Sequence, residues 1–381
     1  MNTTTNTASA SNGMLAVGGI GLIVSLGIVL MKLMSEGHSA FATTANIPWG
    51  LPISTYLFFV LASTGLTFVA ALSMVFGIKG FYPIAKRSVW LAIITLIAGF
   101  AALGLEIGHP FRMIWTFPAG MQFRSPMFWM GVFYTADLVL LLFKFQKMNA
   151  DDWDSGASRQ LGVASFVAVV LAQGTLGSVF GMMAMRPFWY DGLVPVFFLV
   201  TAALSGAAFV VLFIQIAYRG NTDSMPLDVK ALMTGAMPKV FAAVLGVYLV
   251  FTIARTATGL WSNLEGNEVF RVMYGSMLFH FEFWIGLVVP FFILINGNLR
   301  NQATMQILAS ALVILALFIG RYEFVIMGQM VPMFKGQWTP GLASYMPGLA
   351  EWMLVVLAVS ITLFLYALGA RMFDLSGKPK S

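Results

Sequence analysis

The residues best suited to take part in chemistry gather in one stretch, residues 103–131. It contains Glu106, His109, Arg112 and Arg124, among prolines and aromatic side chains, and it joins two strongly apolar segments. Carboxylate and imidazole groups can exchange protons, and guanidinium groups bind anionic partners. In such an apolar chain we expect this loop to be functional, although Glu106 could also simply cap the end of a helix.

Other ionisable residues lie inside the apolar segments. Such a group costs several kcal/mol within a bilayer unless it is paired or hydrated, so each is a candidate functional residue. They are Glu106, Asp137, Arg255, His280, Glu282, Arg321, Glu323 and Glu351. The alternative is a structural ion pair. Arg321 and Glu323 are two residues apart and point to different sides of a helix, so each needs another partner. We expect Arg255 to pair with Glu282 or Glu323.

Two of these residues are suited to moving protons. His280 lies near a carboxylate in a partly apolar setting, which favours proton exchange near neutral pH. Asp137 is the one group near mid-depth. It could stay protonated, because burial disfavours a charged carboxylate, or it could begin a proton path inward.

The surrounding segments are too apolar for a soluble protein. Of 381 residues, 59% are hydrophobic and 9% are charged, whereas soluble domains carry about 25% charged residues. A run of roughly 20 apolar residues spans a bilayer. The sequence therefore predicts an all-α polytopic membrane protein with about ten transmembrane helices, near residues 13–35, 49–77, 88–106, 126–146, 160–183, 192–218, 233–260, 272–297, 302–329 and 348–371.

The expected domain organisation is one transmembrane domain at 13–371, between a disordered tail at 1–12 and a short tail at 372–381. The first residues carry no positive charge and are not interpreted as a secretory signal. Two pairs of similar segments favour two four-helix bundles at 49–183 and 190–329, with flanking helices. In the first pair FFVLASTGLTFV resembles FLVTAALSGAAFV, and in the second SPMFWMG resembles HFEFWIG. Repeats of this kind occur in membrane proteins, but apolar helices can also resemble one another through composition alone.

Lysine and arginine predict the orientation. Loops after the even-numbered segments hold most of them, including Lys79, Lys86, Arg87, Lys144, Lys147, Arg159, Arg219, Lys230 and Arg300. Cytoplasmic loops are enriched in these residues, so both termini are expected in the cytoplasm of a bacterial or archaeal inner membrane. The buried ionisable groups then gather in the outer half. We interpret the net charge of +6 as this signal and expect no nucleic-acid partner.

The chain has no cysteine, which excludes an iron–sulfur cluster held by thiolates. It has three histidines, two of them in or near loops, which argues against a bis-histidine haem. We therefore expect no metal, haem or cluster in this chain. If it moves electrons, a partner must carry the metal centres.

Three stretches in order resemble one family: residues 47–65 (IPWGLPISTYLFFVLASTG), the loop LEIGHPFRMIW followed by SPMFWMG, and residues 177–204 with the motif MRPFWYDG. They are similar to the polysulfide-reductase membrane-subunit family, of NrfD/PsrC type. RYEFVIMGQ at 321–329 and the ten-helix length resemble its larger branch, which includes membrane subunits of hydrogenase-2 and of Dsr-type sulfur complexes.

The resemblance implies a subunit that binds menaquinone or ubiquinone near the periplasmic side and holds no redox cofactor of its own. It also implies a periplasmic ferredoxin-like iron–sulfur partner. That partner would connect to a catalytic subunit, which could be a molybdopterin enzyme, a multihaem cytochrome c or a hydrogenase. The electron flow could run either way, and the terminal substrate stays open.

Family roles carry over to matching positions. Tyr56 falls where the family has a polar residue associated with the quinone. Glu106 matches the acidic residue of the signature loop, while His109, Pro110, Arg112 and Arg124 belong to the part that faces the iron–sulfur partner. The larger branch often has His-Gln-Ser-Ser in the fifth segment, where this chain has Ala-Gln-Gly-Thr at 172–175. The histidine is absent, so His280 is our candidate for its acid–base role.

These assignments give one hypothesis for the site. Tyr56, Gln173 or Thr175 would hydrogen-bond the quinone carbonyls, and Glu106 and His280 would exchange protons with the outside. Arg112 and Arg186 would seat the partner or stabilise the semiquinone. The main alternative is a secondary transporter, which also uses repeats and buried charges but usually places them at mid-depth. A passive anchor without a ligand is the third possibility, against which the buried ionisable groups argue.

Overall fold

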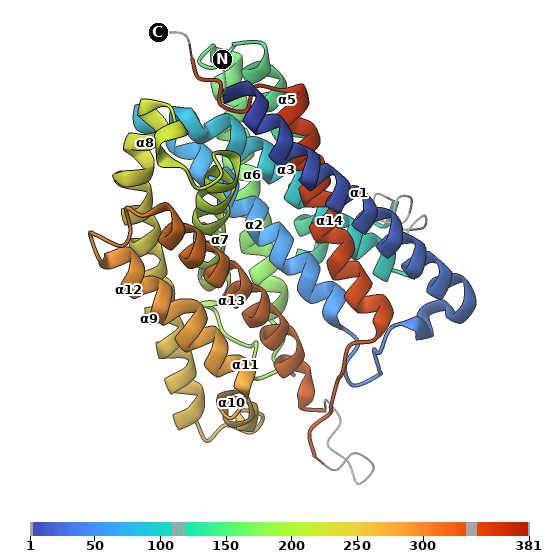
Figure 1. Ribbon diagram of the computed structural model, residues 1–381. Coiled ribbons are helices and arrows are strands. Elements are labelled where there is room, and N and C mark those ends of the chain that lie inside the picture. Colours follow the sequence, from blue (N-terminus) through green and yellow to red (C-terminus); the bar gives the residue numbers. More distant parts are fainter. Residues whose placement is uncertain (1–2, 109–111, 113–114, 116–118, 333–340, 380–381) are drawn as a thin grey trace.

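The computed structural model describes residues 3–108, 112, 115, 119–332 and 341–379, and only the backbone of residues 3–11. In these ranges it is helical, without strands, and ten helices are long and apolar enough to cross a membrane. The expected fold class, an all-α polytopic membrane protein, is confirmed (Figure 1). Helices suit a bilayer because each satisfies its own backbone polar groups.

The helices are α1 (Thr3–Glu36), η1 (Gly37–Ala40), α2 (Leu51–Met74), η2 (Lys79–Phe81), α3 (Tyr82–Glu106), α5 (Pro126–Asn149), α6 (Gly156–Gly181), α7 (Val194–Ala217), η3 (Thr222–Ser224), α8 (Leu227–Thr234), α9 (Ala236–Trp261), α10 (Glu268–Tyr274), α11 (Met277–His280), η4 (Phe281–Val288), α12 (Val289–Ile295), α13 (Ala303–Met330) and α14 (Leu349–Met372). The backbone of α1 extends back to Thr3, through residues for which the sequence analysis expects a disordered tail.

Proline fixes where many of these helices begin. It lacks the N–H group that an internal turn needs, but the first turn leaves that group unbonded anyway. Prolines accordingly occupy the first turns of five helices, at Pro52, Pro83, Pro126, Pro195 and Pro290.

Pro290 lies within a span, where it would interrupt an α-helix. The preceding segment, η4, is π-helical and leads directly into α12. A π-helical turn carries an extra residue and often occurs at functional sites. The helix therefore changes its hydrogen-bond pattern just before the proline, and Glu282 lies in the altered segment.

Two groups of four spans form the body of the protein. Helices α2, α3, α5 and α6 pack together, and so do α7, α9, α13 and the combined span of α11, η4 and α12. Helices α2 and α7 are the most buried and pack against each other at the centre. They cross at Gly65 and Gly206, where a side chain on either glycine would overlap the backbone of the other helix.

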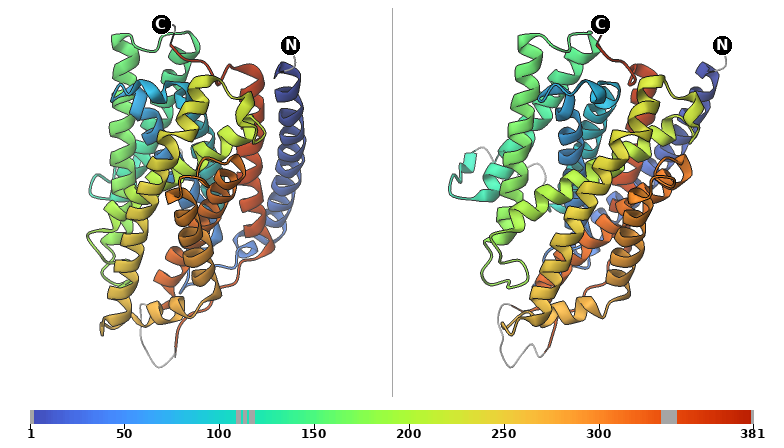
Figure 2. Two further views of the ribbon diagram at one scale, coloured as in Figure 1. Left: turned by 60° about the vertical axis from the view of Figure 1, so that its left-hand side comes forward. Right: turned by 90° about the vertical axis from the view of Figure 1, so that its left-hand side faces the viewer.

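The remaining pair flanks this body. Helix α14 packs on α3, and α1 packs mainly on α14, through a small apolar cluster that includes Val29, Leu354 and Leu357. Figure 2 shows α1 and α14 side by side at the edge of the molecule.

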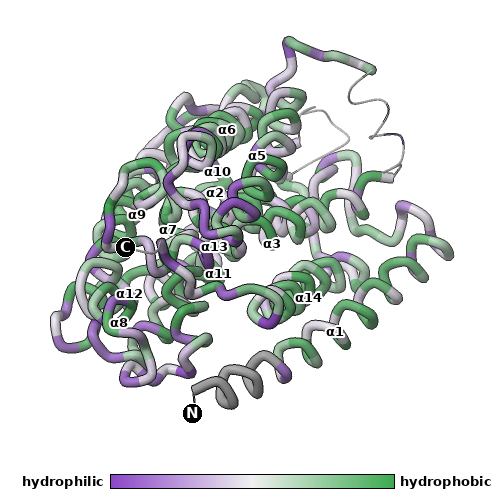
Figure 3. The backbone as a smooth tube through the Cα atoms, turned by 90° about the horizontal axis from the view of Figure 1, so that it is seen from above, coloured by the Kyte–Doolittle hydropathy of each residue, from purple (hydrophilic) through white to green (hydrophobic). Residues whose placement is uncertain are grey.

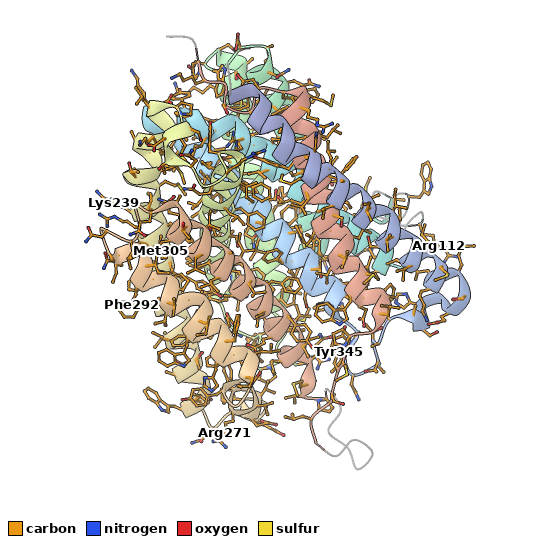
Figure 4. All side chains as sticks on the ribbon, in the orientation of Figure 1. Arg112, Lys239, Arg271, Phe292, Met305 and Tyr345 are labelled. Atoms are coloured by element: carbon orange, nitrogen blue, oxygen red, sulfur yellow. The ribbon has the colours of Figure 1, made fainter. Side chains whose placement is uncertain are left out.

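Both chain termini lie at one end of the helices, which we name the termini end (Figures 1 and 2). The other, named the opposite end, carries η1, α10 and the first turn of α14. The lateral surface is apolar: hydrophobic residues dominate the helices in Figure 3, and Phe292, 61% exposed, projects from it in Figure 4. Such a surface suits lipid contact, because hydrocarbon tails demand no polar covering.

Candidate functional site

A buried polar group, which we name the amide cluster, lies in the first bundle and consists of Tyr56, Thr64, Tyr134 and Gln173. The Gln173 Oε1 atom accepts hydrogen bonds from the Tyr134 hydroxyl at 2.9 Å and from the Thr64 hydroxyl at 3.1 Å. Its Nε2 atom is buried and has no partner among the described residues. A buried amide donor without an acceptor is costly, so this site can offer a hydrogen bond to a ligand.

Within this cluster, the Tyr56 hydroxyl faces a poor hydrogen-bond acceptor. The hydroxyl points to the sulfur of Met130 at 3.7 Å, and the Tyr56 ring stacks on Phe100 at 6.5 Å. A thioether accepts hydrogen bonds only weakly, whereas a carbonyl oxygen accepts them well. Met130 and Phe100 are half-buried, so this edge of the cluster, between α3 and α5, lies near the lateral surface.

One face of α5 continues the polar path toward the termini end. Asp137 follows Tyr134 by three residues and Lys144 follows Asp137 by seven, which places all three on the same side of the helix. The Asp137 Oδ1 atom accepts from the Ser165 hydroxyl at 2.7 Å, and its Oδ2 atom has no partner among the described residues. Lys144 donates to the Ser158 hydroxyl at 2.7 Å and to two carbonyls. Leu141 separates Asp137 from Lys144 and is fully buried.

The motifs that carry the family resemblance meet at the opposite end, in a contact group we name the motif junction: Trp49, Arg186, Trp189 and Gln329. The Gln329 amide donates to the Trp49 carbonyl at 2.8 Å and accepts from the Trp49 N–H at 2.9 Å. The Trp49 and Trp189 rings stack at 5.5 Å. The end of α13 is thereby bound to the start of α2.

Arg186 holds this junction together. Its guanidinium donates to the carbonyls of Gln329 at 3.0 Å, Val331 at 2.8 Å and Asn46 at 3.3 Å. It is 5% exposed, and burial lowers its pKa. The carbonyls at the end of a helix lack partners within it, and Arg186 supplies one. These contacts are structural, and the expected role in binding the quinone or the partner stays a prediction.

Glu106 lies next to a second acidic residue that the site hypothesis does not include. The Glu351 carboxylate accepts from the Tyr345 hydroxyl at 2.5 Å and from the Gly348 N–H at 2.7 Å, and it acts electrostatically on Glu106. The Tyr345 hydroxyl in turn accepts from the first N–H of α2, that of Leu51. Figure 4 shows Tyr345 near the start of α14.

The second bundle holds four ionisable residues around one small cavity: Arg255, Glu282, Arg321 and Glu323, which we name the arginine–glutamate cluster. The cavity has a volume of about 40 Å³, enough for water but too small for a quinone ring. Of the described residues, none of these four forms a direct ion pair with another. Arg255 and Glu282 act on each other electrostatically without such a direct contact, and the expected pairing of Arg255 with Glu282 or Glu323 stays a prediction.

The arginines of this cluster instead lie over aromatic rings. The Arg255 guanidinium lies 4.4 Å from the Phe188 ring and donates to the Phe188 carbonyl at 2.9 Å. The Arg321 guanidinium lies 5.0 Å from the Phe198 ring, and its Nε and Nη1 atoms have no partner in the described part of the chain. Cation–π contacts stabilise desolvated guanidinium groups. Glu323 accepts from the Ser276 hydroxyl at 3.3 Å.

The structure does not bring the two expected acid–base residues together. Glu106 ends α3 in the first bundle, whereas His280 ends α11 in the second and contacts the ring of Tyr274 at 5.4 Å. Among the described residues, His38 lies close to the end of α3: a Cβ on Gly108 would lie 3.6 Å from its Nδ1 atom. The sequence analysis missed His38, although its place at the end of the first span puts it at the depth of Glu106.

The other expected site residues are dispersed. The Thr175 hydroxyl donates to its own helix, to the carbonyl of Leu171 or Ala172 at 2.8 Å, and does not join Gln173. Arg112 and Arg124 are exposed, and Figure 4 shows Arg112 at the edge of the molecule. His109 and Pro110 lie outside the described residues. Within the described ranges, no group of three acidic or histidine residues could hold a metal ion.

The fold and buried polar groups define a polytopic membrane protein with candidate proton- and ligand-binding sites, and the comparisons with known proteins identify its family. The NrfD polysulphide reductase family matches residues 40–333. The chain belongs to this family. The family expected from the sequence motifs is thereby confirmed.

Several relatives match nearly end to end. One subunit of the selenate reductase of Mesobacillus selenatarsenatis is 26% identical, with 95% of this chain and 94% of the relative covered. The Hdr-like menaquinol oxidoreductase integral membrane subunit of Archaeoglobus fulgidus is 23% identical, with 87% and 85% covered. The menaquinone reductase integral membrane subunit of Nitratidesulfovibrio vulgaris is 23% identical, with 89% and 86% covered.

Proposed function

We propose that this chain is the quinone-interacting integral membrane subunit of a respiratory oxidoreductase complex. Two of the relatives are named for menaquinol or menaquinone chemistry, and all three are named as subunits. The observation that carries the proposal is the pair of buried donors in the first bundle. The Tyr56 hydroxyl has only a thioether as acceptor, and the Gln173 Nε2 atom has no acceptor among the described residues.

The quinone head group would enter between α3 and α5 and displace Met130. A methionine side chain is flexible and can move at low cost. One quinone carbonyl would then accept from Tyr56 and the other from Gln173, while Phe100 would cover the ring. When bound, the quinone would accept or deliver two electrons and two protons, and the protein residues would orient it and supply or take up the protons.

Glu106 is the candidate proton donor or acceptor for this head group. It lies about 9 Å along α3 from Phe100, given 1.5 Å per residue, toward the opposite end. Buried Glu351 would relay protons to and from Glu106, and exposed His38 would exchange them with solvent. Asp137 with Ser165, followed by Lys144, offers a separate candidate path toward the termini end. The arginine–glutamate cluster could hold a proton in the second bundle.

The proposed orientation places the termini end in the cytoplasm. Most lysines and arginines belong to segments at that end, in agreement with the positive-inside rule. The loop with exposed Arg112, Trp115, Phe123 and Arg124 would then face the periplasm. Its aromatic and basic side chains suit a periplasmic iron–sulfur protein, which would connect the quinone to a catalytic partner.

The test is to compare Tyr56→Phe and Gln173→Leu with Tyr190→Phe in the complex purified in mild detergent. Tyr190 is 59% exposed, so its substitution controls for loss of a phenol. We expect both site variants to weaken binding of a menaquinone analogue, measured by equilibrium binding, by about tenfold. Unchanged binding in both would exclude this site. A purified chain that binds neither a quinone nor any partner protein would favour the transporter instead.

A further inference from the structure

A second cavity, of about 500 Å³, lies at the termini end, away from every residue of the proposed quinone site. It is formed where α1, α3, α7 and α14 meet. Its walls include Met14 from α1, Arg87 from α3, Tyr218 directly after α7, Arg371 from α14 and Ser376 beyond it. The cavity thus joins the flanking pair of helices to both bundles.

Arg87 brings a nearly buried positive charge to this cavity. The residue is 8% exposed, and its Nη2 atom donates to the Ser376 hydroxyl at 3.0 Å. Its guanidinium lies 5.5 Å from the centre of the Tyr218 ring. The Nε atom is buried without a partner in the described part of the chain. A guanidinium has five N–H donors in a planar fork, and most of this capacity is not used by the protein.

No carboxylate of the described residues forms an ion pair with Arg87. Asp374 also lines the cavity, but its Oδ1 atom accepts from the Ser376 N–H at 3.0 Å, and its charge acts on Lys86. A buried charge without an opposite charge is costly. An anion bound beside Arg87 would remove that cost.

The depth and the lining of the cavity indicate what kind of anion fits. Arg87 lies in the second turn of α3, at the end of its span, where lipid head groups meet a membrane protein. Much of the rest of the wall is apolar, with Ile216, Ala367 and Phe373. A ligand that fills this cavity should therefore be an amphiphile with an anionic group.

We propose that this cavity binds the phosphate group of an anionic phospholipid. Basic pockets between transmembrane helices bind acidic lipid head groups, and a guanidinium fork matches a phosphate in geometry as well as charge. The lipid phosphate would accept from Arg87, and the glycerol backbone and first methylene groups would lie against the apolar wall. The bound lipid would fasten α1 and α14 to the bundles.

The test compares phosphatidylglycerol with phosphatidylcholine, each added to the delipidated protein and followed by native mass spectrometry and by thermal unfolding. We expect phosphatidylglycerol, with its net negative charge, to be retained more strongly and to raise the unfolding midpoint more than zwitterionic phosphatidylcholine. Arg87→Gln should weaken its apparent affinity by about tenfold or more, because it removes charge-assisted hydrogen bonds. Arg159→Gln is the matched control, since Arg159 is exposed and does not line this cavity.

A second variant leaves Arg87 intact. Ala370 lines the cavity and is exposed, so Ala370→Trp fills the space from its edge without burying a new charge. It should also abolish retention of the lipid. Equal retention of the two lipids, or normal retention of phosphatidylglycerol in both variants, would overturn the proposal. The proposal would also be overturned if inorganic phosphate raised the unfolding midpoint and no lipid were retained, since the site would then bind a free anion.

Discussion

Gly65 of α2 and Gly206 of α7 lie in direct backbone contact, and they occupy matching positions in the two similar segments FFVLASTGLTFV and FLVTAALSGAAFV. The two central helices therefore cross at residues that occupy equivalent positions of the two similar segments. A Cβ on Gly206 would overlap the carbonyl carbon of Gly65. Small residues allow such close approach of helices in membranes.

Gly206→Ala should destabilise the protein by about 3 kcal/mol, the upper range for overpacking, because neither backbone can move without separating the bundles. The measurement is the thermal unfolding midpoint in detergent. Gly104→Ala is the control: Gly104 lies in α3 with nothing within 4 Å of an added Cβ, so its replacement should be neutral. Similar midpoints for the two variants would contradict the close crossing.

Arg186→Lys should lower stability by about 3 kcal/mol, because a lysine cannot reach the carbonyls of Gln329, Val331 and Asn46 together. Thermal unfolding measures this loss, and Arg271→Lys, at an exposed position, serves as the control. Quinone affinity should change little in the folded fraction. A stable variant with weakened quinone binding would instead support the ligand role expected from the sequence.

Tyr345→Phe should remove a pH-dependent contribution to stability. Burial, and then the hydrogen bond to Glu351, raise the pKa of the Tyr345 phenol above its ordinary value of 10.0. A raised pKa means that the stabilisation is complete below about pH 10 and is lost as the pH rises above it. The difference in unfolding midpoint between wild type and variant should be constant from about pH 6 to 9 and shrink at higher pH. A constant difference beyond pH 10 would contradict the assignment.

Glu106→Gln should slow quinone-linked turnover by about a hundredfold or more, within the range found for loss of a general acid or base. His280→Ala should leave it nearly unchanged, because His280 lies in the other bundle. Both are measured as electron transfer between a quinol analogue and an artificial acceptor. Equal losses of turnover in the two variants would support the acid–base role of His280 that the sequence suggests.

Asp137→Asn should keep electron transfer but abolish proton movement if the Asp137 path operates. The reason is that an amide cannot release the proton that a carboxylic acid can. Proteoliposomes with a pH-sensitive dye report proton movement, and Ser165→Ala tests the hydrogen bond at 2.7 Å. Unaltered proton movement in Asp137→Asn would restrict this residue to a structural role.

The spans were predictable because hydropathy alone selects helices long enough to cross a bilayer. The ends of the spans were harder to predict. The third span was expected at residue 88, with Lys86 and Arg87 in a loop, but α3 begins at Tyr82 and both side chains are buried. Positive charge predicts a position near a membrane surface, not whether a helix has already begun there.

The candidate site was predicted only in part. Tyr56 and Gln173 both lie near Tyr134, in segments whose depth the topology fixes, and their shared role in quinone binding stays a prediction. The contact between Gln329 and Trp49, and the proximity of His38 to Gly108, join residues far apart in sequence. Such contacts depend on how helices pack laterally, which neither hydropathy nor spacing specifies.

The packing of α1 on α14 sets an order for biosynthesis. The ribosome delivers α1 to the membrane before any other described helix and α14 after all of them, yet α14 is the main neighbour of α1 and joins it to the bundles. Helix α1 must therefore span the lipid bilayer without its main packing partner while the bundles assemble. A chain stalled before α14 would leave α1 exposed along its length, a state that quality-control proteases could recognise.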